Sequence, residues 1–192
     1  LALNFDWDHA DQYADEASLR RVFTRLFEKT KGTILIPREG GVDGLLPGRP
    51  GATVHRFASG HDAATAPPGG DALNRANREA AAATLKLLGM DEPSVPASDF
   101  PGVRRRQTVL LAARGLRVLE DYAHHPTEIA ATIDGARELY PDRRLVVVFQ
   151  PHTYSRTHAL FDSFAKALGK ADVVHLLPIY AAREENESGV SS

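Results

Sequence analysis

Apolar residues recur every three or four positions over residues 17–29, which is the spacing that one buried face of a helix requires. Two short apolar runs follow, at 33–37 and 52–57, and predict strands separated by a loop rich in glycine and proline. Residues 58–71 show no periodicity, so we expect a mobile surface loop there. An alanine-rich helix is predicted over 72–89, where the final glycine can adopt a left-handed cap.

The second half of the chain alternates apolar strands with helical patterns. Residues 107–123 predict two strands joined by an Arg-Gly turn, and Pro126 suits the first position of a helix. Continuous apolar strands are predicted at 144–149 and 172–180, with a helix between them at about 157–168. Strands that are apolar on both faces and alternate with helices favour an α/β fold, with a parallel sheet covered on both sides.

Two of these strands run directly into dense polar turns. The segment "EDYAHHPTE" begins at Glu120, and the segment "QPHTYSRT" begins at Gln150. In open α/β sheets, ligands bind just beyond the carboxyl ends of the strands, where the loops to the next helices gather. Both turns are therefore expected at the same rim of one sheet, and together they form the candidate site.

The turn that begins at Gln150 carries His152, Tyr154, Arg156 and Thr157. If Arg156 and Thr157 lie near a helix N-terminus, free backbone N–H groups and a guanidinium group there suit a carboxylate or a phosphate. The alternative is structural: Thr157 caps the helix and Arg156 forms a surface ion pair. The pattern alone leaves both interpretations open.

The turn that begins at Glu120 offers a carboxylate, a phenol and two imidazoles, on Asp121, Tyr122, His124 and His125. Adjacent histidine side chains usually point in different directions, which disfavours a two-histidine metal site. We expect one histidine in the cleft, and the other either capping or packing.

Composition limits the classes of partner. The 192 residues are 43% hydrophobic and 25% charged, with a net charge of -2 and no cysteine. Such a chain is globular, has no field that favours nucleic acid or an anionic membrane, and cannot form disulfides or thiolate metal sites. No apolar run approaches the roughly 20 residues that span a bilayer, and no signal-peptide pattern is present at the start, so we expect a soluble protein.

The sequence begins at Leu1 rather than at methionine. Residues 1–5 look like the last part of a buried strand, which predicts that this sequence is a piece of a longer chain. A stretch with three prolines and a turn at Gly102 is the predicted boundary between two parts.

Three further clusters each have a functional and a structural interpretation. His9, within "DWDHAD", could bind a divalent cation with neighbouring carboxylates, or the acidic turn could simply be solvated. Asn74 and Asn77 lie three positions apart on one helix face, where their amides could read a purine edge or cap the helix start. The arginines at 104–106 could clamp phosphates or form an ordinary basic surface.

The order of these clusters along the chain resembles the Mur ligases of peptidoglycan synthesis. "EDYAHHPTEI", "VVVFQPHTYSRT" and "IYAAREENESGVSS" resemble the C-terminal domain of that family. "LNFDWDHAD", the asparagine pair and "FPGVRRR" are similar to the later part of its central ATPase domain. The resemblance implies a partial central α/β domain at 1–99, and a Rossmann-like C-terminal domain at 100–192 with a parallel-rich sheet and helices on both faces.

The activity that the resemblance implies is ATP-dependent amide synthesis in the bacterial cytoplasm. ATP phosphorylates the carboxylate of UDP-N-acetylmuramate, and the amine of L-alanine attacks the acyl phosphate. Such chemistry needs Mg²⁺ and cationic groups around the transferring oxygens, with water excluded between closing domains. It needs no nucleic acid, no membrane insertion and no covalent enzyme nucleophile, and the oligomeric state is left open.

The resemblance also implies roles for residues that bind the cofactors. His9 matches the family histidine that helps to bind the metal. Asn74 and Asn77 match the pair that approaches adenine. Arg106 matches the arginine that reaches the ATP phosphates, and Tyr122 lies where an aromatic ring approaches ATP.

The catalytic residues that the resemblance implies lie in the two polar turns. Asp121 matches the family aspartate near the nucleotide, while His124 and Arg156 match positions around the amino-acid substrate and the new amide. Two departures stand out: Leu73 replaces a frequent histidine, and Thr153 replaces a frequent arginine. The second departure leaves Arg156 with more of any carboxylate binding.

The 192-residue sequence contains neither the glycine-rich phosphate loop of the family nor a domain for the UDP-sugar. We therefore expect no turnover by these 192 residues alone. One alternative is the Mur-type recycling ligase that attaches a tripeptide to the same sugar nucleotide. "QPHTYSRT" and "IYAARE" favour the alanine enzyme over it. A non-catalytic nucleotide-binding module is the alternative from a different class.

Overall fold

The structure is a computed structural model that describes residues 1–58, 72–90 and 103–192, with the backbone alone for 72–76. The chain divides into two compact units, Leu1–Glu92 and Pro93–Ser192, and each is described by itself. Residues 59–71 of the predicted loop lie outside the described residues. The boundary predicted between residues 99 and 100 lies outside them too and stays a prediction.

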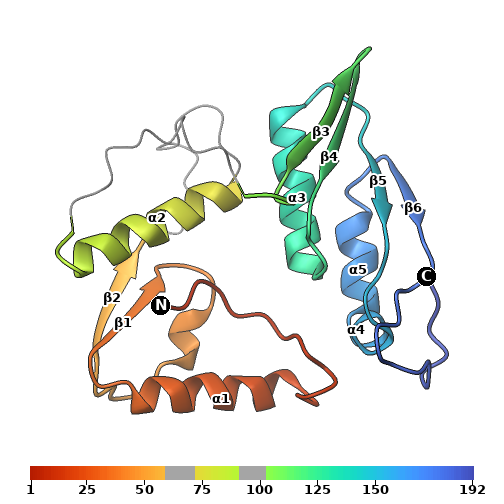
Figure 1. The fold of residues 1–192 in the computed structure, drawn as a ribbon. Coiled ribbons are helices and arrows are strands. Elements are labelled where there is room, and N and C mark those ends of the chain that lie inside the picture. The colour runs from red at the N-terminus through yellow and green to blue at the C-terminus, as the bar shows by residue number, and fades with distance from the viewer. Residues whose placement is uncertain (59–71, 91–102) are drawn as a thin grey trace. The chain divides into compact units, whose positions relative to one another are not determined.

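The first unit folds a helix and two parallel strands around a small core (Figure 1). The helix α1 (Glu16–Lys29) and the strands β1 (Thr33–Pro37) and β2 (Thr53–Phe57) confirm the predicted elements to within one residue. A short 3-10 helix, η1 (Val42–Leu45), connects the strands. The helix α2 (Ala72–Leu87) confirms the alanine-rich pattern. The main core cluster consists of Phe27, Ile34, Ile36, Val42, Leu45 and Ala52.

The N-terminal residues run beside this core without forming the predicted strand. They have no regular secondary structure, although the Ala2 N–H donates a hydrogen bond to the Leu35 carbonyl (3.0 Å). Ala2 and Phe5 pack against the core, while Leu1 is 65% exposed. The strand prediction is wrong. The two residues that pack against the core, Ala2 and Phe5, are three positions apart, whereas a strand turns every second side chain to the same face.

A tight hairpin opens the described part of the second unit. The strands β3 (Thr108–Ala113) and β4 (Leu116–Glu120) pair antiparallel and confirm the two strands predicted there. Arg114 and Gly115 both have positive φ, at 50° and 79°, as a two-residue hairpin turn requires. Glycine adopts this conformation without the steric cost that Cβ imposes.

Helices cover one face of the second strand pair. The strands β5 (Val146–Phe149) and β6 (Val173–Leu176) run parallel, and the helices α3 (Pro126–Leu139) and α5 (Phe161–Leu168) pack against them. A six-residue helix, α4 (Tyr154–Ala159), follows β5. The core between these layers consists of Ile129, Ile133, Phe149, Phe164, Ala167 and Leu168.

Two details of the second unit differ from the expectation. The single helix predicted at about 157–168 is two helices, because Leu160 leaves helical geometry (φ -114°, ψ 21°) between α4 and α5. The single sheet is also not formed, since the described strands make three two-stranded sheets. The Arg-Gly turn pairs β4 with β3, and among the described strands β4 is not hydrogen-bonded to β5. Val146 and Val148, on the other face of β5, are 48% and 65% exposed.

No helix in the described ranges is both long enough and apolar enough to cross a bilayer.

Ile36 is 0% exposed, so truncating its side chain is expected to leave a cavity and to lower the stability of the fold considerably. Ile36→Ala is expected to lower the free energy of unfolding by about 2–4 kcal/mol, because the buried methyl groups are lost and the space is not refilled. Urea unfolding followed by circular dichroism measures this difference. The control is Arg21→Ala on the exposed side of α1, and an equal effect of the two changes would contradict the core assignment.

Candidate functional site

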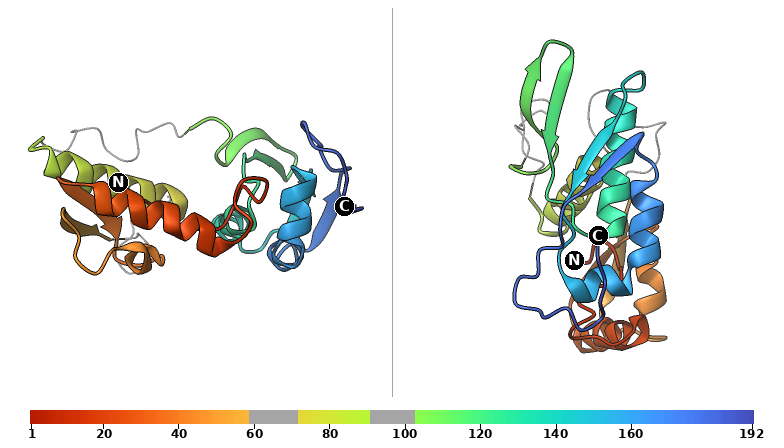
Figure 2. Two further views of the ribbon diagram at one scale, coloured as in Figure 1. Left: turned by 90° about the horizontal axis from the view of Figure 1, so that it is seen from below. Right: turned by 90° about the vertical axis from the view of Figure 1, so that its right-hand side faces the viewer.

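The two polar turns lie at the same end of the second unit (Figure 1, and Figure 2, right). β4 and β5 both end there, α3 begins there, and α4 lies beside the end of β5. The strands that lead into the turns belong to different two-stranded sheets, so the shared rim is formed by the unit and not by one sheet.

Asp121 connects the first turn to the segment that precedes β3. Its Oδ2 accepts a hydrogen bond from the Gln107 backbone N–H (3.0 Å), and its Oδ1 accepts one from that of Ala123 (2.8 Å). The Asp121 side chain is only 10% exposed, and the Arg106 guanidinium lies 4.0 Å from Oδ1. This geometry shows that Asp121 orients the turn, and its predicted catalytic role stays a prediction.

Glu128 completes the start of α3. Its Oε2 accepts from the backbone N–H groups of His124 (3.0 Å) and His125 (3.4 Å), and its Oε1 lies 3.7 Å from Arg106 Nη1. Partial burial raises the pKa of Glu128, but these N–H donors and the nearby positive charge outweigh it and hold the pKa below the ordinary value of 4.5. Arg106, predicted to reach ATP phosphates, thus lies between two carboxylates of its own unit.

The two histidines take different tasks, as expected. His125 is the N-cap of α3, and its Nδ1 accepts from the Thr127 N–H (3.3 Å). The partly exposed His124 places Nδ1 3.0 Å from the Tyr122 carbonyl oxygen. A carbonyl can only accept, so Nδ1 of His124 carries a hydrogen, and in the neutral ring Nε2 has the acceptor lone pair.

Tyr122 presents an exposed ring beside this histidine. Tyr122 is 56% exposed. The His124 ring meets it edge-on, with the two ring centres 5.5 Å apart, and the Arg105 guanidinium carbon lies over the Tyr122 ring, 5.9 Å from its centre. An exposed aromatic ring flanked by a cation offers a stacking surface for a planar ligand.

The second turn places Arg156 inside a helix. α4 begins at Tyr154, and Arg156 Nη1 donates to the His152 carbonyl oxygen (2.5 Å). Thr157 is buried, and its hydroxyl donates to the Thr153 carbonyl (2.6 Å). The interpretation of Thr157 as the cap is therefore wrong, since Thr153 occupies the N-cap position.

Two N–H groups at the start of α4, those of Tyr154 and Ser155, are already bonded. The Glu184 carboxylate accepts from the Ser155 backbone N–H (2.7 Å) and from the hydroxyls of Ser155 and Thr153 (2.6 Å each). The expectation of free N–H groups for a ligand anion is wrong for these two residues. An incoming carboxylate would instead have to meet side chains such as Arg156.

The remaining predicted residues lie in the first unit. His9 is exposed, and its carbonyl accepts from the N–H groups of Gln12 (2.8 Å) and Tyr13 (2.9 Å). No group of three or more histidine, aspartate and glutamate side chains suited to a metal is found in the described part of the chain. Asn77 is exposed on α2, and the side chain of Asn74 lies outside the described residues. Their binding roles stay predictions.

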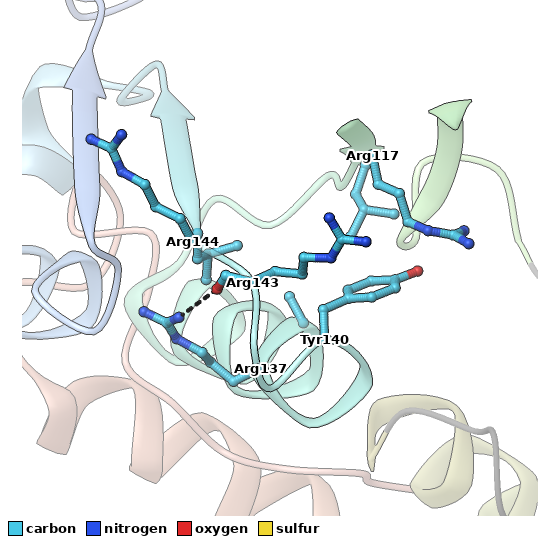
Figure 3. Close-up of a pocket in the computed structure, with 8 residues that line it drawn as sticks. Arg117, Arg137, Tyr140, Arg143 and Arg144 are labelled. Carbon is cyan, nitrogen blue, oxygen red and sulfur yellow. Dashed lines mark hydrogen bonds between the residues drawn. The ribbon is translucent and has the colours of Figure 1, made fainter. Parts of the chain in front are cut away.

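A pocket of about 70 Å³ lies at the other end of the second unit, where α3 ends and β5 starts (Figure 3). Arg143 Nη1 donates to the Gly115 carbonyl (2.9 Å), Arg137 Nη1 donates to the Arg143 carbonyl (3.1 Å), and Arg117 lies over the Tyr140 ring at 5.3 Å. Arg144 points away from this ring (Figure 3). These contacts join parts of the protein to one another, so we assign the arginine cluster a structural role. It lies at the opposite end of the unit from the carboxyl ends of β4 and β5.

Comparison with known proteins assigns the second unit. Residues 104–192 match the family model described as "Mur ligase, glutamate ligase domain". Residues 104–192 belong to the Mur ligase family.

Curated relatives match more than half of the chain. The UDP-N-acetylmuramate–L-alanine ligase of Agathobacter rectalis is 50% identical over 123 residues, which are 63% of this chain and 27% of the relative. The ligase of the same name from Levilactobacillus brevis is 48% identical over 112 residues, 58% of this chain and 25% of the relative. This chain thus spans about a quarter of the length of these curated relatives.

Two solved structures share the fold of this chain. UDP-N-acetylmuramate-alanine ligase MurC from Thermotoga maritima has a TM-score of 0.60 at 24% identity, covering 93% of this chain and 45% of that one. A murein peptide ligase from Psychrobacter arcticus has a TM-score of 0.53 at 18% identity, covering 91% and 48%. At these identities the likeness concerns the fold, and it confirms the predicted α/β class.

Two carboxylates of the Mur ligase domain are absent from the set of predicted site residues. Glu128 stands three residues after the N-cap, which is the spacing of a capping box, but the cap is a histidine rather than the usual serine or threonine. Glu184 lies 31 residues after Thr153, so no local spacing signals their contact. Its only sequence signal is its place in the family-like segment "IYAAREENESGVSS".

Glu128 predicts a pH-dependent stability. Its pKa is lowered in the folded state, so its stabilising effect is present above pH 4.5 and is lost as the pH falls through the folded-state value. Glu128→Gln is expected to cost about 1 kcal/mol of unfolding free energy at pH 7, the size of a helix-capping interaction. The cost should be smaller at about pH 3 than at pH 7, because protonation of Glu128 removes the charge.

Urea unfolding at both pH values measures this cost, with the exposed Glu187→Gln as control. A cost that stays constant with pH would contradict the role of the Glu128 charge.

Proposed function

We propose that the complete protein joins L-alanine to UDP-N-acetylmuramate in an ATP-dependent reaction of peptidoglycan precursor synthesis. The observation that carries this proposal is the Mur ligase domain at residues 104–192, together with 46–50% identity to relatives named for that reaction. The acyl phosphate intermediate, the bacterial cytoplasm as location and a link to cell shape and division belong to the same proposal.

The residues of the two turns suit an amino-acid substrate. Arg156 offers a planar guanidinium to the alanine carboxylate, and its bond to the His152 carbonyl limits the orientations of the side chain. His124 Nε2 can accept the proton that the alanine ammonium group loses before attack. Asp121 and Glu128 hold the backbone from which His124 projects.

The described residues also offer groups that fit the cofactors. The exposed ring of Tyr122 suits an adenine, and Arg106 suits a phosphate if the phosphate replaces part of its contact with Asp121 and Glu128. ATP would supply the phosphoryl group that activates the muramoyl carboxylate. Mg²⁺ usually needs only one or two protein carboxylates beside substrate phosphates, so His9 and its acidic neighbours stay candidates for it.

The role of Arg156 predicts a selective kinetic defect. In the complete enzyme, Arg156→Ala is expected to raise KM for L-alanine by roughly 10- to 100-fold, because a charged hydrogen bond to the substrate carboxylate is lost. KM for ATP should change by less than about twofold. Steady-state phosphate release measures both values, with Arg144→Ala as control, and an unchanged alanine dependence would remove the assigned role.

The choice of acceptor separates the proposed function from its alternative. The complete enzyme should release phosphate from ATP with UDP-N-acetylmuramate and L-alanine, and far more slowly with the tripeptide as acceptor. The 192 residues alone should release none, because a phosphate-binding loop is not among them. Preference for the tripeptide would favour the recycling ligase, and turnover by the isolated chain would refute the second expectation.

A further inference from the structure

Residues after β6 run parallel to the second polar turn, with a parallel bridge between His152 and Tyr180. The Leu177 N–H donates to the Phe149 carbonyl (2.9 Å), and the Tyr180 N–H donates to the Pro151 carbonyl (2.8 Å). The Tyr180 ring stacks on His152, with the ring centres 5.2 Å apart and the planes 11° from parallel. We call residues 177–184 the C-terminal strap, because they follow the turn from the end of β5 to the start of α4.

The strap ends in a carboxylate that bonds to the first turn of α4. The Glu184 carboxylate accepts hydrogen bonds from the hydroxyl groups of Thr153 and Ser155 and from the Ser155 backbone N–H. The Tyr154 backbone N–H donates a further hydrogen bond to it. Thr153 stands at the N-cap without making a capping hydrogen bond of its own. Glu184 therefore performs from 31 residues away the task that an N-cap side chain usually performs locally.

Because α4 is short, its geometry depends on the hydrogen bonds from Glu184. A helix of six residues has too few internal hydrogen bonds to be stable alone, so its geometry depends on contacts from outside. Arg156 follows directly on Ser155, the residue that Glu184 holds through both its backbone and its side chain. A change in the first turn would therefore change the direction of the Arg156 side chain.

We propose that Glu184 is a positioning residue, which fixes the first turn of α4 and so holds Arg156 in the orientation that receives the carboxylate of the amino-acid substrate. The part about the substrate rests on the proposed function. The part about the turn rests on the described contacts alone.

Amide hydrogen exchange on the 192-residue chain tests the contact with the turn. In Glu184→Ala and Glu184→Gln, exchange at the Ser155 amide is expected to accelerate by about tenfold or more, because a charged acceptor is lost. Amides in the middle of α3 should keep their rates, which reports an intact fold. The matched control is Glu185→Gln, the exposed neighbour, and unchanged exchange at Ser155 would overturn the proposal.

Kinetics of the complete enzyme test the effect on Arg156. Glu184→Gln should raise KM for L-alanine by about tenfold while KM for ATP stays within about twofold, and Glu185→Gln should change neither value. A fall in kcat with both KM values unchanged would overturn the positioning role. If the unmodified enzyme does not ligate L-alanine, the proposed function fails, and the exchange rates still decide whether Glu184 holds the turn.

Discussion

A carboxylate bound to the exposed N–H groups at the start of a helix is the interaction on which both polar turns depend. The first N–H groups of any helix lack partners within the helix, and here they lie where functional side chains are placed. Glu128 supplies the acceptor for the turn before α3, and Glu184 supplies it for α4. The two turns are thereby ordered by the protein itself, before any ligand binds.

This arrangement decides how an anionic substrate can bind. At α4 the Glu184 carboxylate occupies the N–H groups of Tyr154 and Ser155 at the positive end of the helix, so these two donors are not available to a ligand. Recognition must then come from side chains whose directions the turns determine, chiefly Arg156 and His124. Preorganised side chains of this kind lower the cost of ordering the site when the substrate arrives.

The local elements could be predicted from the sequence because their signals are local. The apolar spacing in α1, the proline at the start of α3 and the Arg-Gly turn between β3 and β4 each act within a few residues. The prediction that His124 and His125 have different roles rested on the same kind of signal, since the side chains of adjacent histidines usually point in different directions.

The errors arose where distant contacts decide the structure. The apolar pattern of β4 and β5 does not show which strands pair, and the described β4 and β5 lie in separate two-stranded sheets rather than in the single sheet expected. The helix N-terminus at α4 could not be recognised as occupied, because its acceptor comes from residue 184, beyond β6. The roles implied for His9, Asn74 and Asn77 depend on ligands and so remain predictions.

The most direct test of this account is a carbon-13 NMR titration of the side-chain carboxyl groups of Glu128 and Glu184. Hydrogen bonds from the turns outweigh burial, which alone would raise the pKa of each group, and hold both below the ordinary value of 4.5. Titration midpoints below 4.5 are expected for both residues. A midpoint at or above 4.5 for either one would contradict the claim that its ionised carboxylate holds the turn.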